Sequence, residues 1–209
     1  MRSQIHVLAL ASAAAALPKI PFITSYEIIP TLKAPVIVPR QQQACFVIGS
    51  ETLPEETQEI ADALASSVTC DDSATTLSGV PDVASSSSPG LTFSSVDFST
   101  SGQSPLAFAL NTFFAADALA DSNLAAFEAA RDVYLATEAG IRSVGGDLAI
   151  KVPKFFLEFQ VSRIQTAQGN PPTDAGLQVD HLLDKVLTNA AGEDQSLLDQ
   201  VTALAAQLQ

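Results

Sequence analysis

Positive charge is scarce in this chain and unevenly placed. The 209 residues hold 10 Lys and Arg against 23 Asp and Glu, for a formal net charge of −13. Residues 41–209 alone hold 6 basic and 22 acidic side chains, a net charge of −16, whereas residues 1–40 carry +3. Binding to a phosphate backbone depends on Lys and Arg side chains that displace counterions. The composition therefore argues against nucleic acid and anionic lipid surfaces as partners.

Sequence motifs of catalysis are also missing. The chain has no tryptophan and two tyrosines, so a two-carboxylate glycosidase would lack its usual sugar-stacking aromatic residues. No nucleophile elbow, zinc-ligand spacing or phosphate-binding loop occurs. One histidine, His181, follows the leader; it is either a general base or a partly exposed helix residue. We expect no metal, no cofactor and no enzymatic activity, with an acid-residue hydrolase kept as an alternative.

The apolar run near the start of the chain is too short to span a membrane, which takes about 20 residues. A basic start, an alanine-rich apolar middle and small residues before Pro18 predict a secretory signal peptide over residues 1–18. Residues 19–40 are rich in proline, which forbids a helix. We interpret them as a propeptide clipped after Arg40, or as a disordered leader that is never clipped. No transmembrane segment is expected.

Only two cysteines occur, Cys45 and Cys70. In an oxidising compartment such a pair indicates one disulfide. It would close a loop of about 25 residues, which contributes roughly 3 kcal/mol to stability. A capping box that starts at Thr52 predicts a helix over about 53–68, which would carry Cys70 back toward Cys45. Residues 41–72 are therefore predicted to be a disulfide-tied arm, or a short strand, followed by the first helix.

Residues 73–103 are rich in serine, proline and glycine. We predict a loop of low order over about 73–90, open to O-glycosylation. Its main apolar cluster, Leu91 to Phe98, suits one short strand or an arm laid across the helices.

Residues 104–209 have helical periodicity. Ser104 and Pro105 form an N-cap and first-turn pair, and glycine-containing breaks follow at 145–146, 169 and 192. Pro153 permits either a first turn or a kink. The expected fold class is all-α: a helical bundle of about five helices with one disulfide-tethered N-terminal arm and a Ser-rich loop.

Basic and phenylalanine residues gather in one region of this bundle. The candidate ligand pocket consists of Phe155, Phe156, Phe159 and Arg163, near four further basic residues: Arg131, Arg142, Lys151 and Lys154. Two interpretations stay open. The phenyl rings could take an acyl chain while a cation holds its carboxylate, or the cations could contact an anion or acidic glycan. Alternatively, the rings are core residues flanked by solvated basic side chains.

The layout resembles small secreted cell-wall and conidial surface proteins of filamentous ascomycete fungi. The resemblance is carried by the alanine-rich signal, the leader ending in Pro39-Arg40-Gln41, the single cysteine pair and the serine-rich stretch at 85–95. It extends more loosely to helical cell-wall mannoproteins that bind hydrophobic ligands. It implies a non-enzymatic protein of the wall or spore surface, with wall polysaccharide as partner, that shields the surface from host recognition. The alternatives are a secreted helical carrier of a lipid or other hydrophobic ligand, and a secreted effector or acid-residue hydrolase.

Overall fold

The structure is a computed structural model that describes residues 43–208. The predicted signal peptide, the leader and the cleavage after Arg40 lie outside the described residues. Within 43–208 the chain forms six α-helices and one two-stranded antiparallel sheet. The predicted helical architecture is confirmed. The all-α class needs correction, because the chain inserts a β-hairpin between its first two helices.

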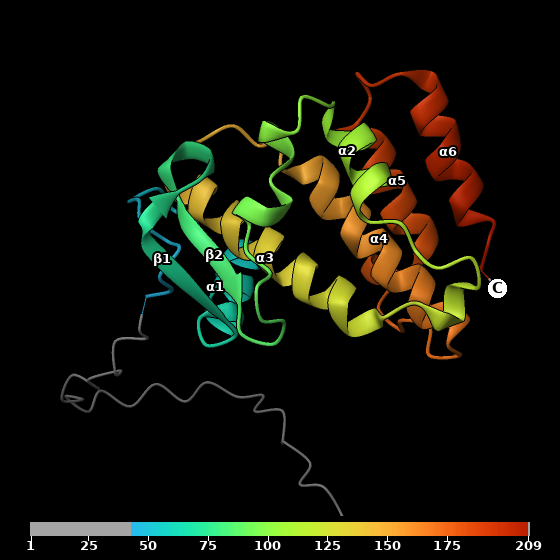
Figure 1. The fold of residues 1–209 in the computed structure, drawn as a ribbon, viewed down its shortest axis with the longest axis horizontal. Helices are drawn as coiled ribbons and strands as arrows, with labels where there is room; N and C mark the ends of the chain where they lie inside the picture. Colours follow the sequence, from blue (N-terminus) through green and yellow to red (C-terminus); the bar gives the residue numbers. More distant parts are fainter. Residues whose placement is uncertain (1–42, 209) are drawn as a thin grey trace, which may run out of the picture. The chain divides into compact units, whose positions relative to one another are not determined.

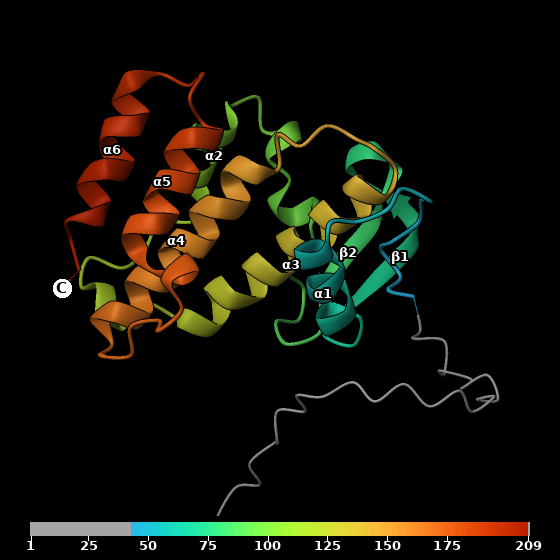
Figure 2. The same ribbon diagram turned by 180° about the vertical axis from the view of Figure 1, so that it is seen from behind.

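Figures 1 and 2 show the arrangement of these elements. In chain order they are α1 (Glu55–Leu64), β1 (Val68–Thr75), β2 (Pro81–Ser85), α2 (Pro105–Thr112), α3 (Leu124–Ser143), α4 (Lys151–Ala167), α5 (Val179–Asn189) and α6 (Gln195–Ala205). The long helix α3 packs against α1 and β2 and also against α4. Helix α4 packs in turn on α2 and α5, and α5 carries α6 at the outer edge of the bundle.

The first helix is shorter than predicted. It ends at Leu64, and Val68 is already buried in β1. Val68 continued the four-residue spacing of Ile60 and Leu64, so the helical pattern extended one apolar residue too far. The β-branched Val68 and Thr69 suit a strand better than the last turn of a helix. Cys70 therefore lies on β1, opposite Val83 of β2.

The segment predicted as a loop of low order is largely folded. Residues 68–85 form the hairpin, and the serine-rich stretch after it is tied down by carboxylates. Asp82 accepts hydrogen bonds from the Ser94 amide at 2.9 Å and the Ser94 hydroxyl at 2.5 Å. Phe93 and Phe98 are buried. Serine here supplies hydrogen bonds to a defined structure rather than flexibility, which composition alone did not reveal.

The helices after Ser104 follow the predicted pattern. The Ser104 hydroxyl caps α2 by accepting from the Ala107 amide at 3.4 Å. Pro153 lies in the first turn of α4, so of the two alternatives the first turn is correct and no kink occurs there. This position tolerates proline because its missing N–H has no partner inside the helix.

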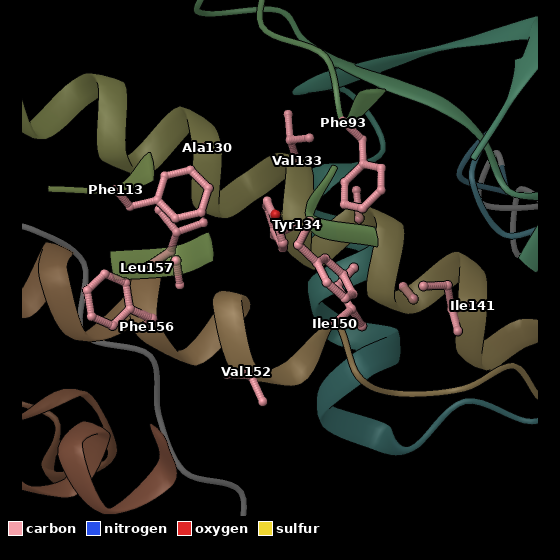
Figure 3. Packing of buried hydrophobic residues seen from close by; sticks show 14 of the residues in the cluster. Phe93, Phe113, Ala130, Val133, Tyr134, Ile141, Ile150, Val152, Phe156 and Leu157 are labelled. Atoms are coloured by element: carbon pink, nitrogen blue, oxygen red, sulfur yellow. The ribbon is translucent and has the colours of Figure 1, made fainter. Parts of the chain in front are cut away.

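The core is continuous from the hairpin to α4. Tyr134 of α3 is fully buried, and its hydroxyl donates to the Val96 carbonyl at 2.6 Å. Its ring lies between Phe93 and Phe113, with edge-on centroid distances of 5.2 and 5.7 Å (Figure 3). Tyr134 thus connects the serine-rich segment to the bundle.

The N-terminal arm, residues 43–54, is extended and docks on the end of α3. The disulfide between Cys45 and Cys70 is present, with Cα atoms 6.0 Å apart, which confirms the predicted pairing. Phe46 beside it is fully buried. The Gly49 amide donates to the Ser143 hydroxyl at 3.0 Å, and the Glu51 amide donates to the Ser143 carbonyl at 2.9 Å. The arm is therefore held by a covalent bond, a buried ring and backbone hydrogen bonds.

Candidate functional site

A pocket of about 490 Å³ lies between α2, α4 and α6, and we call it the α2/α4/α6 pocket. Phe156, Gln160 and Arg163 of α4 form its floor. Its walls come from elements distant in sequence: Leu110 and Phe114 at α2, and Ala203, Leu204 and Gln207 at α6. Phe114 is 73% exposed, so a large apolar ring stands at the pocket without a cover of its own.

Arg163 is the unusual residue of this floor. Its side chain is buried, with 3% of the residue exposed. Its Nη1 donates to the Gln160 side-chain carbonyl, and its Nη2 donates to the Gln207 backbone carbonyl at 2.9 Å. Nε is buried and has no hydrogen-bond partner within residues 43–208. Burial lowers the pKa of the Arg163 guanidinium to about 10, so the group stays cationic at neutral pH.

Gln160 and Phe159 hold the guanidinium in place. Gln160 is almost fully buried, and its Nε2 donates to the Phe113 carbonyl at 2.8 Å. Its side-chain carbonyl is thereby aimed at Arg163. The Arg163 Cζ atom lies 5.5 Å from the centroid of the Phe159 ring, a cation–π distance. The charge is thus oriented by an amide and a ring rather than by a carboxylate.

The predicted candidate pocket is brought together in part. Phe156 and Arg163 lie in the α2/α4/α6 pocket, and Phe159 packs beneath Arg163. Phe155 lies on another side of α4, where the Lys154 Nζ atom is 3.4 Å from its ring centroid. Helical spacing accounts for the split: residues four and seven positions apart share a face, and adjacent residues do not. The same spacing from Phe156 points to Gln160, which sequence reasoning missed.

The basic residues do not form one cluster. Arg142 and Lys154 both pair with Glu138, at 2.7 and 3.3 Å, and Lys154 lies 3.7 Å from Glu158. We call these four side chains the ion-pair network. Burial raises the pKa of the Glu158 carboxyl, and the neighbouring Lys154 ammonium opposes that rise. Because the charges of this network offset one another, its cations are already occupied.

A second groove, of about 630 Å³, runs over the ion-pair network and is lined by Phe155 and His181. His181 is exposed on α5, as one of its two sequence interpretations predicts. Within the part of the chain that the structure describes, no group of three or more His, Cys, Asp or Glu side chains could hold a metal ion. None of the helices in residues 43–208 has the length and apolar character needed to cross a membrane.

These features define a disulfide-tied helical protein with one small hairpin and an arginine-floored pocket. The chain belongs to the family described as Domain of unknown function (DUF7143), which matches residues 47–209. The match covers the hairpin, the six helices and the α2/α4/α6 pocket. No curated protein and no solved structure matches the chain. The family description names no activity, so function has to be argued from the site.

Proposed function

We propose that this protein is an exported, non-catalytic binding protein that takes a small apolar ligand in the α2/α4/α6 pocket. The pocket itself carries the proposal. Its volume of about 490 Å³ falls within the range of about 300–1,000 Å³ that small-molecule sites occupy. Leu110, Phe114 and Leu204 supply apolar contact area, and the polar floor is confined to α4 and its partners. This combination of apolar walls and few polar groups is typical of ligand sites.

Filling the pocket tests the proposal. Ala203→Trp places an indole on the pocket-lining side of α6. We expect it to weaken binding of decanol or decanoate by about tenfold or more, because it occupies the space that the ligand needs. Thr202→Trp is the matched control, since Thr202 is equally exposed on α6 but does not line the pocket. Isothermal titration calorimetry measures both. Wild-type protein that binds neither compound, or equal losses in the two variants, would contradict the proposal.

A wall-associated surface protein is the second candidate, supported by the filled interior of the bundle. Phe156 and Phe159 are fully buried, with ring centroids 6.1 Å apart, so side chains occupy this part of the core. We propose, together with the fungal resemblance of the precursor, that the protein is exported to a cell wall or spore surface. There it would contact wall polysaccharide and shield the surface from host recognition.

Fractionation of the producing cells tests this candidate. We expect the protein in wall extracts, with Gln41 as its first residue if the leader is clipped after Arg40. N-terminal sequencing checks the cleavage, and deletion of the gene should alter the wall surface. A protein confined to the culture filtrate, with an unaltered surface after deletion, would count against it.

A further inference from the structure

We infer that the α2/α4/α6 pocket recognises a monocarboxylate with an apolar chain, its carboxylate on Arg163 and its chain toward Phe114 and Leu204. The inference rests on the proposed function, to which it adds the chemical class of the ligand. It is carried by the geometry of Arg163, which was described above for its position and is argued here for what it lacks.

Arg163 is a buried cation whose charge is not neutralised within residues 43–208. None of the ion pairs in this part of the chain includes it. Its two hydrogen-bond acceptors, the Gln160 amide and the Gln207 backbone carbonyl, are both neutral. Burying a charge without an opposite charge is expensive, and proteins normally pair such groups. A bound anion would supply the missing charge.

The other cations of the described chain behave differently. Arg131 pairs with Asp132 at 2.8 Å, and Arg142 and Lys154 belong to the ion-pair network. Arg163 lies apart from all three, at a pocket. The contrast shows that the chain has carboxylates to spare for its basic residues, yet places none beside this one.

Charge and shape favour a carboxylate over other anions. A guanidinium fork matches the two oxygens of a carboxylate in a bidentate pair. A single cation balances one negative charge, and the acidic body repels ligands with more. Asp117, which is exposed and also lines the pocket, adds to that repulsion. A sulfate or phosphate dianion is therefore disfavoured, and a monocarboxylate is the best match.

The site is also pre-organised for this ligand. Gln160, held by the Phe113 carbonyl, and the Phe159 ring fix the guanidinium before any ligand arrives. Fixing a binding group in advance lowers the entropy cost of association. The apolar residues Phe156 and Leu204 continue the pocket away from the charge, where an alkyl chain would lie.

The experiment compares decanoate with decanol, which share an alkyl chain and differ in charge. Both are titrated calorimetrically into wild type and into Arg163→Met, which keeps an unbranched apolar side chain. We expect Arg163→Met to weaken decanoate binding by about thirtyfold or more, as for loss of one partner of a buried charge pair, and to leave decanol within about twofold. Arg163→Lys should recover part of the loss, since it restores the charge without the fork.

Gln160→Glu is the second variant, and it keeps the buried arginine. It places a carboxylate of the chain itself beside Arg163, so it should abolish the preference for decanoate over decanol while decanol still binds. Asp117→Asn should strengthen decanoate binding only. Equal affinities of wild type for the two compounds, or unchanged decanoate binding in Gln160→Glu and Arg163→Met, would overturn the inference and leave the apolar pocket standing. Failure of wild type to bind either compound would overturn both.

Discussion

Replacing Gly49 by alanine is expected to destabilise the protein by about 3 kcal/mol. A Cβ atom at Gly49 would lie 1.8 Å from the Ser143 carbonyl oxygen and 2.8 Å from the Val144 amide nitrogen. Both are backbone atoms at the end of α3, so neither can swing aside as a flexible side chain could. The arm must lift away from α3, and it would lose its hydrogen bonds to Ser143.

Gly192→Ala is the matched control for this substitution. A Cβ atom at Gly192 meets no atom within 4 Å, so we expect a change between zero and a gain of about 1 kcal/mol from the less flexible unfolded chain. Urea denaturation of the two variants and wild type gives the free energies directly. Equal unfolding free energies for Gly49→Ala and Gly192→Ala would show that the arm does not dock as described.

The helices were predictable because their signals are local. Ser104 before Pro105 marks the start of α2, and the breaks around residues 145 and 169 mark the ends of α3 and α4. Each of these rests on a few neighbouring residues. The disulfide was predictable for a related reason: with only two cysteines in the chain, a single pairing is possible.

The hairpin was not predictable in the same way. The strand β1 carries Asp71 and Asp72 on exposed positions and buries only Val68 fully, so it lacks a clear alternation of apolar and polar residues. What stabilises it lies elsewhere in the chain: the pairing with β2, and the packing of β2 on α3. Such contacts between distant segments leave little trace in a local pattern.

The pocket shows the same division. Phe156 and Arg163 were found because both lie on one helix at a spacing that brings them to one face. The walls from Leu110 and Leu204 could not be found, because they depend on how α2 and α6 pack around α4. Phe155 was assigned to the pocket on proximity in sequence alone, and its position next to Phe156 turns it toward Lys154.

Removing the disulfide with the double substitution Cys45→Ser and Cys70→Ser is expected to lower the free energy of unfolding by about 3 kcal/mol. The bond joins residues 25 apart, and its loss frees that loop in the unfolded chain. It also releases the arm beside Phe46, whose ring is buried in the core. The loss in the native state and the gain of freedom in the unfolded state act in the same direction.

A reducing agent separates the disulfide from the side effects of substitution. Wild type in dithiothreitol should fall to the stability of the double variant, while the variant itself should not respond, as measured by urea denaturation with and without reductant. A wild type indifferent to reductant would refute a stabilising bridge. The pocket shares no residue with the arm or with β1, so the folded double variant should bind decanoate as wild type does. Stability and ligand recognition would then reside in different parts of the chain: the arm and hairpin at α3, and the arginine floor at α4.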